Sequence, residues 1–279
     1  GVDKEGEHTK WIDLVQRAVR SMKEQGLMSK VVLARALEMP SSGQRRLSLG
    51  GTMKELRDRF NDCHVFLVKP PGRPAFLGAT PERLVSLSGS RLTTTALAGT
   101  RPRGATSAED AKLAKDLLSA SKDREEHLLV VQEIESVLNP LSSRVAIPST
   151  PVVRQLRNVQ HLETPISADL HPDFAGDLLE ILGRLHPTPA LGGSPRELAL
   201  DWIQGNEGWD RGWYAAPLGW VDQDGDGEFI VGIRSALVSN HTSWLFSGCG
   251  IVSESIPESE WEETNAKLKA IADALRYDV

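Results

Sequence analysis

The sequence predicts an α+β fold built on large antiparallel β-sheets. Helical and strand-like segments follow one another without the regular βαβ rhythm of a doubly wound sheet. Short apolar segments are also separated repeatedly by Gly- or Pro-containing turns that suit hairpins. The composition, 40% hydrophobic and 25% charged over 279 residues, suits a soluble protein with a substantial core. We find no internal repeat or linker, and expect residues 1–279 to form a single domain.

Apolar periodicity assigns the individual elements. It predicts helices at 10–25, at 107–138 with a break near Ser119–Ser121, at 177–185, at 196–205 and at 258–277. Apolar and β-branched runs predict strands at 29–39, 64–70, 75–79, 83–89, 91–97, 213–222, 227–239 and 243–253. Residues 143–170 are irregular and strand-like. The segment DQDGDGEF starts like a calcium loop at Asp222, but its twelfth position is Ile233 rather than Glu, so we predict a hairpin turn.

Charge and cysteine content exclude several classes of function. The net charge of -6 gives no reason to expect a nucleic-acid partner. Two cysteines, Cys63 and Cys249, are too few for a disulfide framework and fit a reducing compartment. No apolar stretch is long enough to span a membrane, and the polar N-terminus does not have the pattern of a signal peptide. We therefore expect a cytoplasmic protein. Because its net charge is negative, the lysine and arginine side chains that bind an anion must be gathered at the binding site.

The helix expected up to residue 138 carries two acids on its apolar stripe. On a helical wheel, Asp123 and Glu126 lie with Val130, Ile134 and Leu138. Buried carboxylates need a cation, a metal or hydrogen bonds to offset their desolvation. Acids are also favoured in the first turn of a helix without burial, because they interact with the helix dipole. The pattern alone leaves both interpretations open.

The last helix shows a similar arrangement. Its apolar stripe is flanked by Glu260, Glu263 and Lys267. Glu263 and Lys267 are four residues apart and are therefore neighbours on the helix surface. A surface ion pair beside the core is the more common origin of such a pair. The alternative is a half-buried carboxylate that ligates a metal, next to a lysine that binds an anion.

Lys30 and Glu82 are candidates for acid–base chemistry. Lys30 opens the strand KVVLAR and shares a face with Val32 and Ala34 if the strand alternates. A lysine on an apolar face can act as a general base, although a solvated strand end is the simpler interpretation. Glu82 follows Pro81 between two short strands, where a glutamate is usually a surface turn residue.

Small residues mark two further segments. In LAGTRPRG, Gly99 and Thr100 offer a backbone amide and a hydroxyl to a carboxylate, unless the segment is a plain turn. In FSGCGIV, Gly248 and Gly250 allow close approach of a ligand or of another strand. Ser253 occupies the third glycine position of a dinucleotide fingerprint, so we do not expect a dinucleotide site. The seven histidines show no H-x-x-x-H metal spacing.

Taken in order, these segments resemble the chorismate-utilising enzyme family, which includes anthranilate synthase component I, and within it the isochorismate synthases. The matching stretches are KVVLAR at 30–35, FLGATPERLV at 76–85, ALAGTRPRG at 96–104, KDREEHLLVVQEI at 122–134, VQHLETP at 159–165, LHPTPALGG at 185–193, IVGIRSA at 230–236, LFSGCGIV at 245–252 and EWEETNAKL at 260–268. No single stretch is decisive, but nine in the same order are specific.

The resemblance implies a fold of two large stacked sheets flanked by helices, with a site in the cleft between them. It implies that Lys30 is the general base that activates water and that Glu82 is the acid that protonates a departing hydroxyl. It implies Mg²⁺ held by Glu126 and Glu263, with Glu260 near the metal. The substrate, chorismate, would be contacted by Gly99, Thr100, His161, Ala190, Leu191, Arg234, Gly248, Gly250 and Lys267. It also leads us to expect a monomer.

The implied reaction explains these residue types. Water would add at ring C2 of the chorismate dianion while the C4 hydroxyl leaves, giving isochorismate, so both an acid and a base are required. We expect partial burial to raise the pKa of Glu82. Anthranilate synthases typically carry Gln at the position of Lys30, and aminodeoxychorismate synthases carry Lys at that of Ala98. Salicylate synthases, which go on to eliminate pyruvate, tend to carry Thr in the loop that holds Ala190 and Leu191 here.

One departure from the family concerns the N-terminal region. Only 29 residues precede Lys30, whereas family members usually have a longer region before this position. The resemblance therefore leads us to expect a fold that lacks some N-terminal strands, with an exposed sheet edge. A non-catalytic chorismate-binding protein is the alternative class. The presence of both an acid and a base favours an enzyme, whose product could enter siderophore, menaquinone or another aromatic biosynthesis.

Overall fold

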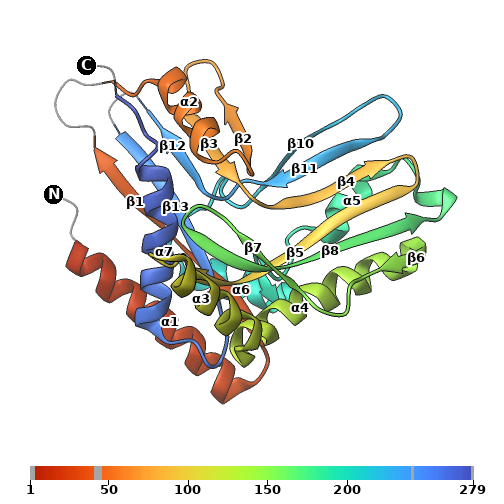
Figure 1. The fold of residues 1–279 in the computed structure, drawn as a ribbon, viewed down its shortest axis with the longest axis horizontal. Coiled ribbons are helices and arrows are strands. Elements are labelled where there is room, and N and C mark those ends of the chain that lie inside the picture. Colours follow the sequence, from red (N-terminus) through yellow and green to blue (C-terminus); the bar gives the residue numbers. More distant parts are fainter. Residues whose placement is uncertain (1–3, 41–45, 240–241, 278–279) are drawn as a thin grey trace.

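The computed structural model describes residues 4–40, 46–239 and 242–277 (Figure 1). The strands form two sheets in which all pairings are antiparallel, as the sequence predicts. Sheet 1 has the order β2 (His64–Val68), β3 (Ala75–Thr80), β12 (Ser235–Val238), β13 (Thr242–Ile251), β1 (Lys30–Pro40) and β9 (Gly193–Ser194). Sheet 2 has the order β10 (Pro217–Val221), β11 (Gly227–Val231), β4 (Arg83–Ser88), β5 (Arg91–Pro102), β8 (Val159–Leu170) and β6 (Ser142–Ala146), and β7 (Val152–Gln155) also pairs with β8.

Helices cover both sheets. They are α1 (Lys4–Gln25), α2 (Leu49–Arg59), α3 (Ser107–Ser119), α4 (Ser121–Leu138), α5 (Leu178–Leu185), α6 (Arg196–Asn206) and α7 (Pro257–Ala272), with 3-10 turns at Asn139–Leu141 and Pro172–Phe174. In Figure 1, α1 and α7 lie together beside sheet 1, and α4 runs below the long strands of sheet 2. No helix in the described ranges is long and apolar enough to cross a membrane.

Three apolar clusters hold these layers together. The largest joins the two sheets, with Ala34 and Phe246 of sheet 1, Leu92 of sheet 2, and Val130 and Ile134 of α4. A second cluster packs α2 and α7 on the outer face of sheet 1, and a third packs α1 and α6 against β1 and β13. Because residues alternate along β1, its odd-numbered residues Val31 and Leu33 face the third cluster. Lys30, Val32 and Ala34 therefore face the space between the sheets.

The chain passes between the two sheets at two adjacent crossovers. β3 of sheet 1 continues through Pro81 and Glu82 into β4 of sheet 2, and β11 of sheet 2 continues through Gly232–Arg234 into β12 of sheet 1. Each crossover is hydrogen-bonded to the strand that leads into the other, because Val231 N of β11 donates to Glu82 O and Ala79 N of β3 donates to Arg234 O, each at 3.1 Å. The prediction of one strand over 227–239 is therefore wrong, since apolar composition does not reveal a change of sheet.

Other boundaries also differ from the prediction. Residues 213–216 form a turn rather than a strand, with Ala215 at a φ of 63°. The last helix ends at Ala272 rather than near residue 277. The helix α2 is not predicted because two glycines occupy its first turn, although Ser48 caps it by accepting a hydrogen bond from Gly51 N. The break at Ser119–Ser121 and the hairpin turn at Asp222 are confirmed.

Candidate active site

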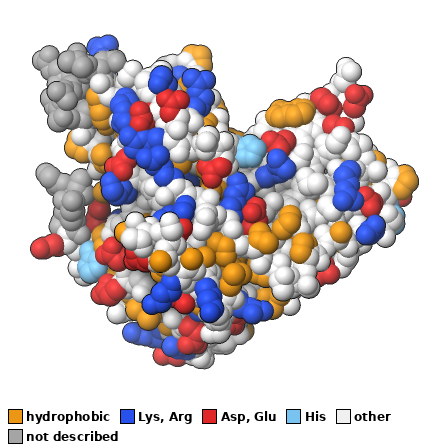
Figure 2. Space-filling view, in the orientation of Figure 1, with side chains coloured by type: hydrophobic (Ala, Val, Ile, Leu, Met, Phe, Trp, Pro, Cys, Tyr) orange, Lys and Arg blue, Asp and Glu red, His pale blue; other side chains and the backbone are white. Residues whose placement is uncertain are grey.

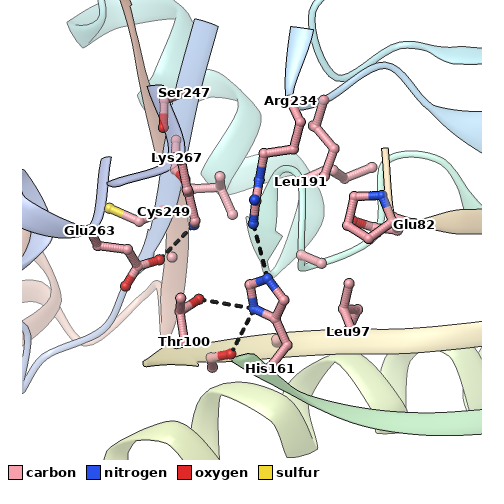
Figure 3. A pocket seen from close by; sticks show the side chains of 18 of the residues that line it. Glu82, Leu97, Thr100, His161, Leu191, Arg234, Ser247, Cys249, Glu263 and Lys267 are labelled. Atoms are coloured by element: carbon pink, nitrogen blue, oxygen red, sulfur yellow. Dashed lines mark hydrogen bonds and ion pairs between the residues drawn. The ribbon is translucent and has the colours of Figure 1, made fainter. Parts of the chain in front are cut away.

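A pocket lies between the sheets beside the two crossovers (Figure 3). All the predicted site residues line it except Lys30 and Glu260. Those lining residues are Glu82, Gly99, Thr100, Glu126, His161, Ala190, Leu191, Arg234, Gly248, Gly250, Glu263 and Lys267. The surface is hollowed between the left and right parts of the molecule in Figure 2, with basic side chains around the hollow. Positions far apart in the sequence thus meet at one pocket, as expected from the resemblance.

Glu82 is a buried acid on the first crossover. Its side chain is held away from water, with only 5% of the residue exposed, so the surface-turn interpretation is wrong. Burial raises the pKa of Glu82 to about 7, although Lys30, Arg234 and Lys267 act in the opposite direction. A carboxyl group of this kind is half protonated near neutral pH and can donate a proton there.

Arg234 is held on the second crossover in a left-handed conformation, with a φ of 49°. Its Nη2 donates to His161 Nε2 at 2.9 Å (Figure 3). Because a guanidinium only donates, Nε2 must accept, and His161 Nδ1 carries the proton that it donates to Gly99 O at 3.1 Å. Burial and Arg234 hold the pKa of His161 well below its usual range, so the ring is neutral. Both ring nitrogens are engaged, and His161 orients Arg234.

Lys30 lies behind the pocket surface and is fully buried. Its Nζ forms an ion pair with Glu126 Oε1 at 3.0 Å. Gly250 makes room for this pair, because a Cβ at this position would lie 2.2 Å from Glu126 Oε1 and 2.7 Å from Lys30 Cε. The interpretation of Lys30 as a solvated strand end is therefore wrong. Burying a pair of opposite charges carries a desolvation cost that is offset only by good geometry.

The helix α7 contributes two further ion pairs. Lys267 Nζ binds Glu263 Oε1 at 2.6 Å and donates to Gly248 O at 2.8 Å. Burial alone would raise the pKa of Glu263, but Lys267, Lys122 and Thr100 together outweigh it and the pKa is lowered. Glu260 Oε1 binds Lys122 Nζ of α4 at 2.5 Å, and burial together with Glu263 raises the pKa of Glu260. Glu260 is buried and the other three groups are partly buried, so none lies on a fully solvated face.

Gly99 shapes the floor of the pocket. The pairing of β5 with β8 shifts between Ala98 and Thr100, so Gly99 is an extra residue in the strand, with a φ of 75°. This bulge directs the Gly99 carbonyl to His161, and Thr100 Oγ1 lies 3.2 Å from the same Nδ1. The plain-turn interpretation of this segment is therefore wrong.

Comparison with known proteins identifies the family. Residues 2–276 match the family model described as chorismate binding enzyme. The chain belongs to the chorismate binding enzyme family. It is 46% identical to the salicylate biosynthesis isochorismate synthase of Pseudomonas aeruginosa over 96% of this chain and 55% of that protein. It is 40% identical to the isochorismate synthase MenF of Bacillus subtilis over 95% of this chain and 55% of that protein. The chain thus spans about half the length of these relatives.

Solved structures of family members share the fold. The putative 2,3-dihydroxybenzoate-specific isochorismate synthase DhbC from Bacillus anthracis superposes with a TM-score of 0.91 at 36% identity, over 96% of this chain and 71% of that one. The menaquinone-specific isochorismate synthase MenF from Escherichia coli gives 0.87 at 33% identity, over 96% and 61%. The predicted fold of this family, two antiparallel sheets with flanking helices, is confirmed.

The magnesium ligands that the family resemblance implies can be tested against their surroundings. Glu126, Glu260 and Glu263 supply the hard oxygen donors that Mg²⁺ prefers. Within the described residues, no three acidic, histidine or cysteine side chains are arranged to hold one ion. Each of these glutamates is instead paired with its own lysine. Lys122 also attracts all three carboxylates. The donor atoms are of the kind that a divalent cation takes, and in the arrangement seen here the lysines provide the compensating charge.

Some lining residues were not predicted from the sequence. They are apolar or small side chains and one proline: Val32, Pro81, Leu97, Ala98, Ile233, Phe246, Ser247 and Cys249. Most could have been found, because they are direct neighbours of predicted residues within the matching stretches. Lys122 was also missed as a site residue, although it precedes Glu126 by one helical turn.

Proposed function

We propose that this chain converts chorismate to isochorismate, with Mg²⁺ as its cofactor. The observation that carries the proposal is Glu82, a buried carboxyl group with a pKa of about 7 in a pocket that also holds Arg234 and Lys267. A protonated acid beside cations suits the departure of hydroxide from a dianionic substrate. Family membership and relatives named as isochorismate synthases support the assignment.

The reaction needs one proton acceptor and one proton donor. In this proposal Lys30 accepts a proton from water as the new C2–O bond forms. The ring double bonds shift, the C4–O bond breaks, and Glu82 protonates the departing hydroxyl, which leaves as water. One water is consumed and one is released, so the product is an isomer of the substrate.

Cations would hold the two substrate carboxylates. Arg234 is oriented by His161, and Lys267 faces the pocket beside Glu263 (Figure 3). Glu126, Glu263 and Glu260 would hold Mg²⁺, which when bound would anchor a substrate carboxylate and offset its charge. The backbone of Gly99, Gly248 and Gly250 lines the pocket. Glycine is required at Gly248 and Gly250, because a Cβ there would lie 2.6 Å from Leu33 O and 2.2 Å from Glu126 Oε1, respectively.

Within the family, the resemblance favours water as the nucleophile and isochorismate as the final product. Lys30 stands where anthranilate synthases typically carry Gln, and Ala98 lines the pocket where aminodeoxychorismate synthases carry Lys. Ala190 and Leu191 present apolar side chains at the position where salicylate synthases tend to carry Thr. Leu191 lies near Glu82 and Arg234 in Figure 3.

The test is incubation of the purified chain with chorismate and Mg²⁺, followed by chromatography of the products. We expect isochorismate, and we expect Glu82→Gln to abolish most of its formation. Salicylate with pyruvate would indicate a salicylate synthase instead. Binding of chorismate without any product would identify a non-catalytic binding protein.

A further inference from the structure

The edge of β1 next to the pocket is completed by side chains. β9 pairs with β1 only at Lys30 and Val31. The next residue, Val32, donates its amide hydrogen to Gly192 O at 2.7 Å. From here on, the polar groups on this edge of β1 are bonded by Glu207 and Arg211 instead of a strand.

Glu207 and Arg211 occupy the donor and acceptor positions of a neighbouring strand. Ala34 N donates to Glu207 Oε1 at 2.7 Å, and Arg211 Nη2 donates to Val32 O at 2.7 Å. The two side chains also bind each other, with Arg211 Nε donating to Glu207 Oε2 at 2.8 Å and Nη2 to Oε1 at 2.5 Å. The pair therefore extends the hydrogen-bonding pattern of the sheet along β1.

The same guanidinium reaches the pocket wall. Arg211 Nη1 donates to Leu191 O at 3.1 Å. Leu191 and Ala190 line the pocket, and Leu191 lies near Glu82 and Arg234 in Figure 3. One planar group thus connects the loop that carries Leu191 to the strand that carries Lys30.

The environment of the pair makes this connection rigid. The side chain of Glu207 is 1% exposed and that of Arg211 is 17% exposed. A buried charged pair is strongly held when its hydrogen bonds are satisfied. Only the fork of an arginine can bond a carboxylate and two carbonyl groups in one plane, so lysine is no equivalent here.

We propose that Glu207 and Arg211 are positioning residues for the reaction: the pair fixes the loop of Ala190 and Leu191 against β1 and so sets the place of the substrate relative to Lys30. Neither residue lines the pocket, so the pair acts through Val32, Ala34 and Leu191. The inference rests on the proposed function of the same pocket.

The test compares the KM and kcat for chorismate of the wild type, Arg211→Met, Arg211→Lys and the neutral double variant Glu207→Gln/Arg211→Met. The double variant is included because Arg211→Met leaves a buried charge unpaired. Arg276→Met is the matched control, since Arg276 also joins a glutamate, Glu55 of α2, to two backbone carbonyls, those of Asp273 and Leu275 beyond the end of α7, and none of these residues lines the pocket. KM does not depend on the fraction of folded enzyme, so a merely structural loss leaves it unchanged.

We expect KM to rise about tenfold and kcat/KM to fall about 100-fold in Arg211→Met and in the double variant. Arg211→Lys should fall between them and the wild type, and Arg276→Met should stay within about twofold of the wild type. A wild-type KM in either Arg211→Met or the double variant overturns the inference. A wild type that neither binds nor converts chorismate would refute the proposed function instead, before any variant is compared.

Discussion

Glu82 and Arg234 lie where the chain passes between the sheets and are held there by backbone. By contrast, ion pairs hold Lys30 to Glu126, between β1 and α4, and Lys267 to Glu263, within α7. We call these two groups the crossover end and the ionic end of the pocket. At the crossover end, Glu82 is buried with no ion-pair partner within contact distance among the described residues, and its pKa rises to about 7. At the ionic end each carboxylate has a lysine within 3.0 Å.

The difference shows how one pocket can hold a proton donor beside charged groups. Desolvation alone favours the neutral form of a carboxyl group, and a nearby ammonium favours its ionised form. The backbone of a crossover positions Glu82 without supplying a countercharge. At the ionic end, β1, α4 and α7 place acids next to lysines. These carboxylates can therefore bind a metal cation or pair with a lysine.

Removal of the base at the ionic end should have the largest effect. We expect Lys30→Ala to lower kcat about 1000-fold or more, because the change removes the proposed proton acceptor. Chorismate binding, measured by calorimetry, should persist through Arg234 and Lys267. Lys269→Ala, which removes an exposed lysine of α7 paired with Asp273, is the control and should keep normal kcat. Near-normal turnover in Lys30→Ala would contradict the assignment of the base.

The second-largest effect should follow from removal of the proposed acid, Glu82, at the crossover end. Glu82→Gln preserves size and removes the donated proton, so we expect kcat to fall about 100-fold. In the wild type, kcat/KM should fall as the pH rises through about 7, because the acid is then ionised. A pH profile of the wild type without this alkaline decline would argue against Glu82 as the acid.

The same group should make stability depend on pH. Because the pKa of Glu82 is raised from 4.5 in the unfolded chain to about 7 in the folded protein, the folded state binds more protons between these values. The free energy of unfolding should therefore fall as the pH rises from about 4.5 to about 7. As the pH rises through this interval, the free energy of unfolding of Glu82→Gln should increase by about 2–3 kcal/mol relative to that of the wild type, as measured by urea titration. An equal pH dependence in both proteins would show that Glu82 is not desolvated.

The smallest effect should come from a metal ligand at the ionic end. We expect Glu263→Ala to raise the Mg²⁺ concentration for half-maximal rate about tenfold or more. Glu262→Ala is the matched control, because Glu262 is exposed one position earlier on α7. An unchanged Mg²⁺ requirement in Glu263→Ala would remove it from the ligand set.

The sequence predicted more of the ionic end than of the crossover end. Helical periodicity placed Glu126 on the buried side of α4, and spacing paired Glu263 with Lys267. Glu82 was assigned only through the family resemblance, because no local pattern distinguishes a strand that ends from a strand that changes sheets. The crossover at Gly232–Arg234 was missed for the same reason.

Sequence patterns also could not predict that Arg211 connects β1 to the loop of Leu191. Glu207 and Arg211 read as an ordinary pair four residues apart, yet their partners Val32 and Ala34 lie more than 170 positions earlier in the chain. Hydrophobic periodicity shows which face of a helix or strand is apolar. It does not show which distant part of the chain that face contacts.

The two hydrogen bonds at the crossovers have a mechanical consequence. They fasten Glu82 to Val231 of β11 and Arg234 to Ala79 of β3, at the corner where the chain passes between the sheets. If the sheets swing apart to admit a ligand, this corner is the pivot and moves least, while the opposite rim travels furthest. Glu82 and Arg234 would then keep their mutual spacing throughout the swing, and only the groups facing them would open and close around the ligand.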